Sequence, residues 1–337
     1  MRIGIVGAGI GGLTAAIALT RQGADCVVHE QRPAPDDDGT GIQISPNAVA
    51  ELRKLGVDLD FAVEVTSREL LRWADGTVLG RTDLSRYGAP YLTMRRGLLT
   101  AALRRTDVHY GRRCATVRDD GSGVTIEFTD GSRERYDLVI GADGLRSAVR
   151  AVVAPAEPID SGLVASRAVI RSDAPPGVRV WLGPGRHCVA YPIAPGLLNL
   201  VAVTPAGRHP DPFGGWDPVV RGLLGRAGEW DRRALYDLPP APVWHRGRVV
   251  LIGDAAHPIL PFIAQGAAQA IEDAVALARS PDLTAFRASR RDRVRRVYEL
   301  SRAGLRVHHL PDGPGQRDRD RGLAVAPADG HDWLYAV

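Results

Sequence analysis

The chain has 337 residues, of which 45% are hydrophobic, so it is long enough to bury a large core. Its formal net charge is +4, but the basic residues are spread along the chain, whereas a nucleic-acid-binding surface needs them clustered. Lys54 is the only lysine, which excludes a GxxxxGK[ST] phosphate-binding loop.

Three cysteines, Cys26, Cys114 and Cys188, lie far apart and form no CxxC pair. This spacing favours a reducing, cytoplasmic setting and offers no cysteine-based zinc site, so we expect no bound metal. The apolar run at residues 3–19 could pass for a signal peptide, but its five glycines instead indicate a strand, a turn and a helix. Elsewhere no charge-free stretch has membrane-spanning length, so neither a membrane nor a nucleic acid is an expected partner.

The N-terminus has the pattern of a βαβ unit. Residues 2–6 predict a buried strand, residues 13–22 a helix, and residues 26–30 a second strand that ends in Glu30. The turn between the first strand and the helix matches G-x-G-x-x-G through Gly7, Gly9 and Gly12. Such glycines allow a tight turn, close approach of a pyrophosphate and close helix packing, so the unit predicts a dinucleotide site.

The next segments alternate between helix and strand patterns. Residues 48–55 and 98–104 predict helices, and residues 70–81 predict two strands around the turn Asp75-Gly76. Further hairpins are predicted around Asp120-Gly121 and Asp130-Gly131, followed by a buried strand at residues 138–140. From about residue 156 to residue 242 the chain is rich in proline and β-branched residues, which indicates a β-rich block inserted into an α/β domain. Its strands are predicted at residues 178–182, 188–192 and 197–203.

The C-terminal part predicts one long helix, at residues 286–306, whose many arginines are expected to form a solvated face. Residues 311–332 are expected to form a loop. The segment Asp332-Trp333-Leu334-Tyr335 is expected to dock back on the body of the protein.

Three separate segments share one signature, an apolar strand that ends in glycine or an acid and turns into a helix: IGIVGAGIGG, LVIGADGLRS and VVLIGDAAHP. In an open α/β sheet, ligands bind beyond the carboxyl ends of the strands, so all three turns are expected to face one crevice. A nicotinamide dehydrogenase needs only the first turn, whereas three turns indicate a larger dinucleotide that stretches across the sheet.

The ordered set of GAGIGG with Glu30, GADGLRSAVR and GRVVLIGDAAHP with the downstream QGA and AIEDA resembles the single-component FAD-dependent aromatic hydroxylases. This family includes para-hydroxybenzoate hydroxylase. Within the family, the sequence motifs of this chain most resemble those of the salicylate, 3-hydroxybenzoate and 6-hydroxynicotinate hydroxylases. The resemblance covers residues 1 to about 300. It implies an α/β fold in which a Rossmann-like FAD-binding domain carries an inserted β-sheet substrate domain and a C-terminal helical segment. The expected division is residues 1–70, 92–155 and 243–285 for FAD, 71–91 and 156–242 for substrate, and 286–337 for the C-terminal helix and tail.

The resemblance also assigns cofactor-binding residues. Gly7, Gly9 and Gly12 would cradle the FAD pyrophosphate, with the N-terminus of the helix facing its charge. Glu30 would bind the adenosine ribose, Arg96 would approach the flavin, and Asp254 would accept hydrogen bonds from the ribityl chain.

Asp143 and Gly144 match the family's Asp-Gly motif, implicated in FAD and NAD(P)H binding, with Arg146 and Arg150 fixing that turn. Pro261 and the turn Gln265-Gly266-Ala267-Ala268 would lie along the isoalloxazine edge, and the predicted cofactor-binding set also includes Gln31, Gln43 and Gly253.

Ordinary structural roles compete with these assignments. Asp143 and Asp254 taken singly would be turn or helix-cap acids, and only their pairing at two strand ends favours a cofactor role. His257, beside Asp254, is interpreted as structural, because no second histidine or acid falls at metal-ligand spacing around it. Ala264 stands where many relatives carry glycine.

His187 and Tyr191, in RHCVAYPI, fall on one face of a predicted strand and resemble the substrate-facing pair of the hydroxybenzoate and hydroxynicotinate enzymes. His187 would then act as base or proton relay, unless it is a satisfied interior histidine. Gln43 would point at flavin or substrate. Family members reduce FAD with NADH or NADPH, form a flavin C4a-hydroperoxide with O₂ and hydroxylate an electron-rich aromatic ring, which here implies a small phenolic or heteroaromatic acid.

Two alternatives stay open, and a third is disfavoured. A flavin-binding protein without turnover would keep the glycine turn, and a monooxygenase could instead act on a larger polycyclic natural product. A flavin halogenase would carry a WxWxIP segment, which the sequence lacks. The chain is expected to act as a monomer or a homodimer.

Overall fold

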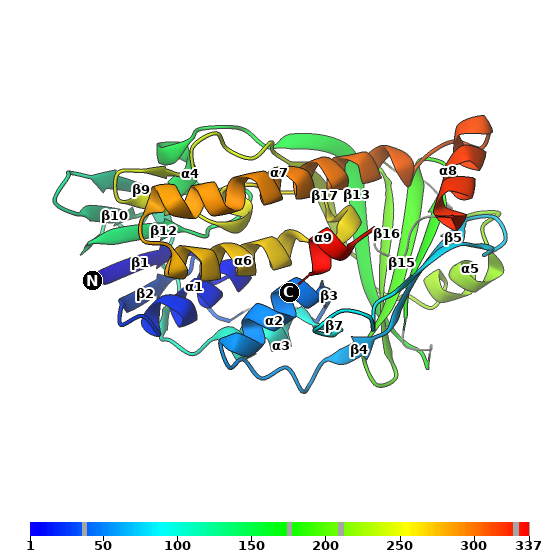
Figure 1. The fold of residues 1–337 in the computed structure, drawn as a ribbon, viewed down its shortest axis with the longest axis horizontal. Coiled ribbons are helices and arrows are strands. Elements are labelled where there is room, and N and C mark those ends of the chain that lie inside the picture. The colour runs from blue at the N-terminus through cyan, green and yellow to red at the C-terminus, as the bar shows by residue number, and fades with distance from the viewer. Residues whose placement is uncertain (36–38, 174–176, 208–211, 326–329, 337) are drawn as a thin grey trace.

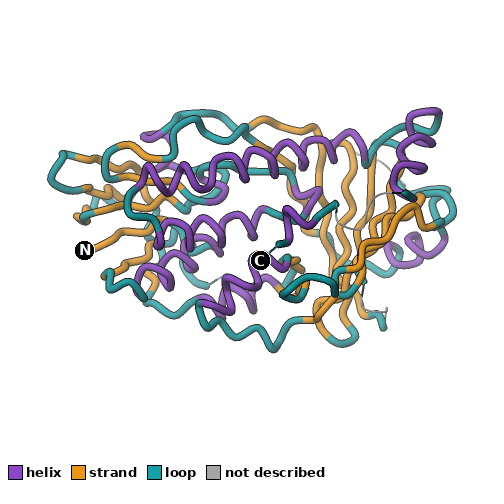
Figure 2. Tube along the Cα trace, in the orientation of Figure 1, coloured by secondary structure: helices purple, strands orange, loops and turns teal. Residues whose placement is uncertain are grey.

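The computed structural model describes residues 1–35, 39–173, 177–207, 212–325 and 330–336. Two main sheets lie at opposite ends of an elongated molecule, and the long helix α7 (Leu283–Val307) runs along the long axis past both of them (Figure 1). Helices and strands are mixed in the part of the molecule that holds the N-terminus, whereas long strands dominate the other part (Figure 2). None of the described helices combines the length and the apolar character that a bilayer-spanning segment requires.

The first sheet has six strands in the order β18-β19-β12-β1-β2-β8, and all its neighbours are parallel except the pair β18–β19. Ile3 and Ile5 of β1 are fully buried, as expected for a strand that is covered on both faces. Helices α1, α4 and α6 follow strands of this sheet. The bounds are β1 Arg2–Val6, α1 Ile10–Thr20, β2 Asp25–His29, β8 Val108–His109, β12 Leu138–Gly141, α4 Ala148–Val153, β18 His245–Arg246, β19 Val249–Leu251 and α6 Gly266–Arg279.

The second sheet has seven strands in the order β17-β13-β16-β15-β14-β5-β6. Its neighbours are antiparallel except for β14–β5, and the predicted strands around Asp75-Gly76 form its edge. The fold class predicted from the sequence, a Rossmann-like domain with an inserted β-sheet domain, is confirmed. The bounds are β5 Ser67–Arg72, β6 Val78–Asp83, β13 Ile159–Arg171, β14 Val178–Gly183, β15 Arg186–Ala194, β16 Leu197–Pro205 and β17 Asp231–Asp237.

Two three-stranded sheets and several short helices complete the described structure, in the orders β3-β7-β4 and β11-β10-β9. The strands are β3 Gly41–Ile44, β4 Val63–Val65, β7 Tyr91–Arg95, β9 Cys114–Asp119, β10 Val124–Phe128 and β11 Arg133–Tyr136. The helices are α2 Pro46–Lys54, α3 Arg96–Leu103, α5 Pro218–Leu224, η1 Gly253–Ala255, η2 Pro261–Ile263, α8 Pro314–Ala324 and α9 Asp332–Tyr335.

The tail corrects one expectation from the sequence. Residues 314–324 form helix α8 rather than a loop, and residues 326–329 of that segment lie outside the described residues. The sequence of α8 has no apolar stripe to signal a helix, and its contacts to the body include an ion pair of 3.1 Å between Arg72 Nη2 and Asp320 Oδ2. The predicted docking of the last residues is confirmed, because Leu334 and Tyr335 are fully buried.

A buried carboxylate, Asp273 of α6, connects three parts of the Rossmann-like domain. Its Oδ2 accepts a hydrogen bond from the Gly253 N–H at 2.9 Å and lies 2.5 Å from His257 Nε2, while its Oδ1 accepts from Arg290 Nε at 2.8 Å. The expected structural role of His257 agrees with this contact. Arg290 of α7 is buried, so the interpretation of the α7 arginines as a solvated face is wrong at this position. Burial opposes ionisation of Asp273, but His257 and Arg290 outweigh it and lower the pKa of this carboxyl to about 2.

We expect Asp273→Asn to lower the free energy of unfolding by about 3 kcal/mol at pH 7, because it leaves the buried Arg290 without its full countercharge. Urea titration followed by tryptophan fluorescence measures this difference. The folded-state pKa lies below the ordinary value of 3.8, so the charged form stabilises the fold above pH 4. The difference between variant and wild type should therefore shrink as the pH falls from about 4 towards 2.

Asp292→Asn, on the same helix as Arg290, is the matched control. The Asp292 side chain is 68% exposed and forms only surface ion pairs with Arg291 and Arg295, so its removal should leave the unfolding midpoint unchanged. Equal effects of the two substitutions would contradict the role assigned to Asp273.

Candidate functional site

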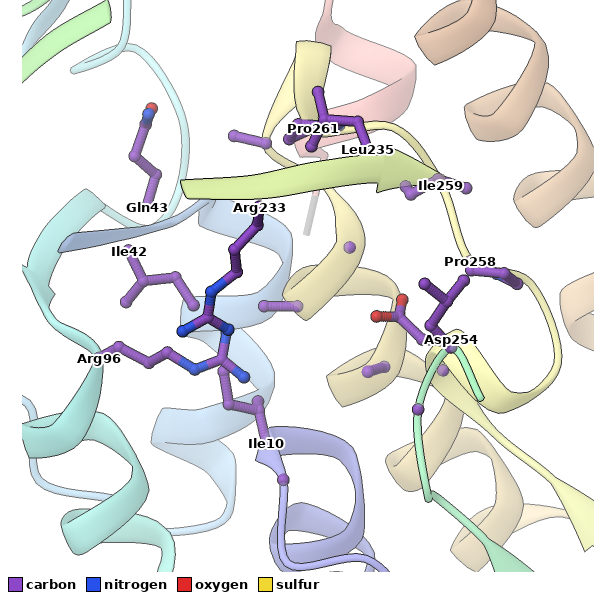
Figure 3. Close-up of a pocket in the computed structure, with 18 of the residues that line it drawn as sticks. Ile10, Ile42, Gln43, Arg96, Arg233, Leu235, Asp254, Pro258, Ile259 and Pro261 are labelled. Carbon is purple, nitrogen blue, oxygen red and sulfur yellow. The ribbon is translucent and has the colours of Figure 1, made fainter. Parts of the chain in front are cut away.

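The three glycine-containing turns predicted from the sequence meet at one edge of the six-stranded sheet. They follow β1, β12 and β19, which are three adjacent strands of the sheet with β12 in the middle. A cavity of about 500 Å³ opens between these turns and the seven-stranded sheet (Figure 3). Eleven residues predicted from the sequence line it: Gly9, Gln43, Arg96, Gly144, His187, Tyr191, Gly253, Asp254, Pro261, Gly266 and Ala267.

The first turn leaves no room for side chains on its inner side. Gly7 has a φ of +106°, and a Cβ there would lie 2.4 Å from the Ala142 carbonyl oxygen. A Cβ on Gly12 would lie 2.0 Å from the Gly7 carbonyl oxygen, whereas a Cβ on Gly9 would meet nothing within 4 Å. Gly9 is the N-cap of α1 and offers no side-chain cap, so the first N–H groups of this helix remain to bind a ligand. The turn therefore fits a pyrophosphate that lies against Gly9.

Glu30 lies on the other side of this turn, beside a second and smaller pocket that it lines with Ala8, Arg32 and Tyr110. Its Oε2 accepts a hydrogen bond from the Ala8 N–H and its Oε1 accepts from the Arg32 N–H, each at 2.9 Å. These bonds fix the carboxylate and leave further lone pairs for a ligand's hydroxyl groups. Gln31, also predicted as a cofactor residue, is exposed and lines neither pocket.

The second turn differs from the expected arrangement. Asp143 does not line the cavity, because its carboxylate caps α4: Oδ2 accepts from the Ala148 N–H at 2.7 Å and from the Val149 N–H at 3.2 Å. Burial raises the pKa of this carboxyl. Gly144 lines the cavity in its place, and a ligand role for Asp143 stays a prediction. Arg150 ties this turn to the third, because its Nη1 donates to the Asp254 and Ala255 carbonyl oxygens at 3.3 Å.

The third turn presents an acid to the cavity. Gly253 has a φ of +58°, which turns the chain sharply after β19. The Asp254 carboxyl lies deep between the cavity walls, and this burial raises its pKa, while His257, Arg96 and Arg150 oppose that shift. The side chain is accessible only because it faces the empty space of the cavity. A carboxyl in this position suits the hydroxyl groups of a polyol chain.

The start of α6 forms the next part of the wall. Ala264 has a φ of 52° and is the only non-glycine residue with a positive φ in the described structure, which explains why a glycine suits this position. Gln265 is fully buried and its Nε2 donates to Ser45 Oγ at 2.8 Å, so it does not cap the helix. Gly266 and Ala267 thus bring free helical N–H groups to the cavity, whereas Ala268 packs in the core.

The opposite wall is the face of the seven-stranded sheet. His187 and Tyr191 of β15 are both buried and both line the cavity, so the structure brings together the predicted catalytic pair. Burial and the nearby His308 and His309 lower the pKa of His187 well below its ordinary value. Gln43 of β3 also lines the cavity, where its Oε1 accepts a hydrogen bond from Tyr91 Oη at 2.8 Å.

Two arginines of this wall were missed from the sequence. Arg167 of β13 and Arg233 of β17 line the cavity, and the register Arg167↔Asp231 and Ala165↔Arg233 puts them on one face of the sheet. The Arg233 side chain points towards that of Arg96 at the start of α3 (Figure 3). Period-two alternation could have signalled Arg167, had residues 159–171 been predicted as a strand, but not the pairing that brings Arg233 beside it.

The residues present fit FAD. Backbone clearance at Gly7 and Gly12, open space at Gly9 and two uncapped helix N-termini suit a pyrophosphate and an electron-rich ring edge. The glycine turn borders both pockets, because Gly9 lines the cavity and Ala8 lines the smaller pocket beside Glu30.

Known proteins resemble this chain over nearly its whole length. The FAD binding domain family matches residues 1–191 and 240–286. A 3-amino-4-hydroxybenzoate 2-monooxygenase, PtmB3 of Streptomyces platensis, is 37% identical over 99% of this chain and 95% of its own length. A 6-hydroxynicotinate 3-monooxygenase of Bordetella bronchiseptica is 34% identical over 92% of this chain and 94% of its own length.

Among solved structures, the fold resembles that of Klebsiella pneumoniae HpxO complexed with FAD and uric acid. The two share 29% sequence identity and a TM-score of 0.88, over 96% of this chain and 92% of the HpxO chain.

Proposed function

The chain belongs to the FAD binding domain family and is an FAD-dependent aromatic hydroxylase that uses NAD(P)H, and on that premise we propose that its substrate is a small hydroxylated aromatic acid. Two relatives support this proposal, since they are named for 3-amino-4-hydroxybenzoate and 6-hydroxynicotinate. Both compounds join a carboxylate to a ring that carries a hydroxyl group. We expect this chain to take a ring of the same size and charge.

One observation carries the proposal: a single cavity has the cofactor turns on one wall and a basic, histidine-containing sheet face on the other. Guanidinium groups bind carboxylates in two-point geometry, so Arg167 and Arg233 are the candidates to hold the substrate's acid group. Arg233 is partly neutralised by Asp231, whose Oδ2 accepts from Arg233 Nε at 2.8 Å. This pairing orients the guanidinium on the sheet face.

His187 is the proposed base. The imidazole is neutral near pH 7 and so has a lone pair that can accept the proton of a phenol, while the burial that lowers its pKa also makes it a weaker base. Removing that proton increases the electron density of the ring, which favours attack by an electrophilic oxygen. Tyr191 lines the same wall four residues later and is proposed to hydrogen-bond the substrate.

Bound FAD would supply the redox chemistry, taking a hydride from NAD(P)H and delivering one oxygen atom of O₂ to the ring. Gly7, Gly9 and Gly12 would hold its pyrophosphate, Glu30 its ribose and Asp254 its ribityl chain. The helix N-terminus at Gly266 and Ala267 would face the flavin edge, and Arg96 would approach the flavin from α3. The apolar residues around the cavity, such as Ile10 and Ile259, would exclude water from the reacting atoms.

The proposed function is tested by measuring NADH and NADPH oxidation with 3-amino-4-hydroxybenzoate, 4-hydroxybenzoate, salicylate and 6-hydroxynicotinate. We expect at least one acid to accelerate oxidation and to gain the mass of one oxygen atom in its product. The amide of the same compound serves as control and should stimulate poorly, because it lacks the carboxylate. If every acid accelerates oxidation no more than its amide, the assigned substrate class is wrong.

Arg167→Gln and Arg233→Gln should each raise KM for a carboxylate substrate about tenfold or more, as expected for loss of a charge-assisted hydrogen bond of roughly 1.5–3 kcal/mol. Steady-state kinetics with the acid and its amide measure the effect, and KM for the amide should change little. Arg232→Gln is the matched control, since Arg232 is exposed on the same strand and does not line the cavity. An equal rise in KM for acid and amide would contradict carboxylate recognition.

Gly9→Ala should weaken FAD binding about tenfold or more while leaving the fold intact, because the new Cβ meets only the open space in which the pyrophosphate would lie. Titration of the apoprotein with FAD, followed by flavin fluorescence, measures the affinity, and thermal unfolding without FAD measures stability. Gly88→Ala is the control, since its Cβ also meets nothing within 4 Å but lies outside the cavity. Unchanged FAD affinity in Gly9→Ala would exclude this turn as the phosphate site.

A further inference from the structure

His309, just beyond the end of α7, contacts His187 from outside the cavity. The two residues are 122 positions apart, yet His187 Nδ1 lies 2.8 Å from His309 Nε2. Their ring planes are inclined by 28° and the centroids lie 5.0 Å apart, so the rings meet edge to edge through these nitrogens. The His309 carbonyl oxygen also accepts a hydrogen bond from the Gly185 N–H at 3.1 Å, which ties the end of α7 to the hairpin that carries His187.

The helix end determines which nitrogen of His309 carries its proton. The Leu305 carbonyl, one turn back in α7, raises the pKa of His309 against the larger lowering effect of burial. A carbonyl oxygen only accepts, and His309 Nε2 is engaged with His187, so Nδ1 is the nitrogen of His309 that can donate to Leu305. In the neutral ring Nε2 is then an acceptor, and His187 must donate to it from Nδ1.

This chain of hydrogen bonds fixes the tautomer of His187. With the proton on Nδ1, the lone pair of His187 is on Nε2, in a ring that lines the cavity. The other neighbours of the ring are His308, at a centroid distance of 5.4 Å, and Phe262, at 5.3 Å. Nδ1 of His308 is buried without a hydrogen-bond partner among the described residues, so His308 does not set this tautomer.

We propose that His309 is a positioning residue, which accepts the Nδ1 proton of His187 so that Nε2 of His187 is the base for the substrate's hydroxyl group. The proposal rests on the proposed function. In the proton transfer the substrate O–H bond breaks and a His187 Nε2–H bond forms, leaving a phenolate and an imidazolium. His309 Nε2 continues to accept from Nδ1 of that imidazolium and stabilises its charge, while Leu305 holds His309 in place. His309 thus orients His187 in the way that a second group orients the general base in many catalytic sites.

The first test compares His309→Phe, which keeps a ring but loses the acceptor, with His309→Gln, whose amide can accept from His187 and donate to Leu305. Single-turnover hydroxylation is measured with a phenolic acid and with a ring-fluorinated analogue that is already ionised at the assay pH. His309→Phe should slow the phenolic acid roughly tenfold or more but change the ionised analogue less than about twofold. His309→Gln should stay within about threefold of the wild type on both compounds.

His308→Phe is the control, because it removes an adjacent buried imidazole that makes no hydrogen bond to His187 in the described structure, and it should hydroxylate both compounds at near wild-type rates. Equal slowing of the two compounds by His309→Phe would indicate a packing role and overturn the proposal. No slowing of either compound would overturn it as well.

The tautomer itself can be measured without substrate. Long-range ¹H–¹⁵N spectra of histidine-labelled protein should report the Nδ1–H form of His187 in the wild type and in His309→Gln, and loss of that form in His309→Phe. An Nε2–H form in the wild type would overturn the proposal. If the wild type hydroxylates none of the acids tested, the proposed function fails, and this spectrum still decides the role of His309.

Discussion

The ion-paired carboxylate of Asp273 is the contact on which the site's geometry depends. It holds the Gly253 N–H, and so the turn that presents Asp254, while Arg290 fixes α7 against α6. Nineteen residues separate Arg290 from His309, which a helical rise of 1.5 Å per residue converts to about 28 Å. One buried charge therefore anchors the cofactor turn directly and, through a rigid helix, the histidine behind the substrate wall.

The cofactor half of the molecule could be predicted because its requirements are local. Strand, glycine turn and helix follow one another within about ten residues, and backbone clearance leaves no alternative to glycine at Gly7 and Gly12. Local patterns could not predict how a side chain is used once the chain folds. Asp143 occupies the expected position at a strand end, yet its oxygens are engaged in capping α4.

The substrate half depends on contacts between distant segments, which a single sequence does not reveal. Arg167 and Arg233 come onto one face only through the pairing of β13 with β17, and His309 reaches His187 only through the path of α7. Helix α8 was missed for a related reason, since it is polar all round and its ion pair to Arg72 involves a residue almost 250 positions earlier. Tertiary contacts determine the arginine face, the His187–His309 contact and helix α8, and local sequence propensity indicates none of them.

The course of α7 limits how such an enzyme can be recombined. Five of the seven strands of the inserted sheet, β13 to β17, look like an exchangeable module, because they follow one another in the chain and could be cut out at two loops. A chimaera that exchanged only this block would place the β15 histidine of another enzyme beside the α7 end of this chain. Nothing would then preserve the 2.8 Å contact that joins His187 Nδ1 to His309 Nε2 in this protein. The part of the chain that would have to be exchanged is therefore discontinuous, consisting of the sheet together with the residues that follow the end of α7.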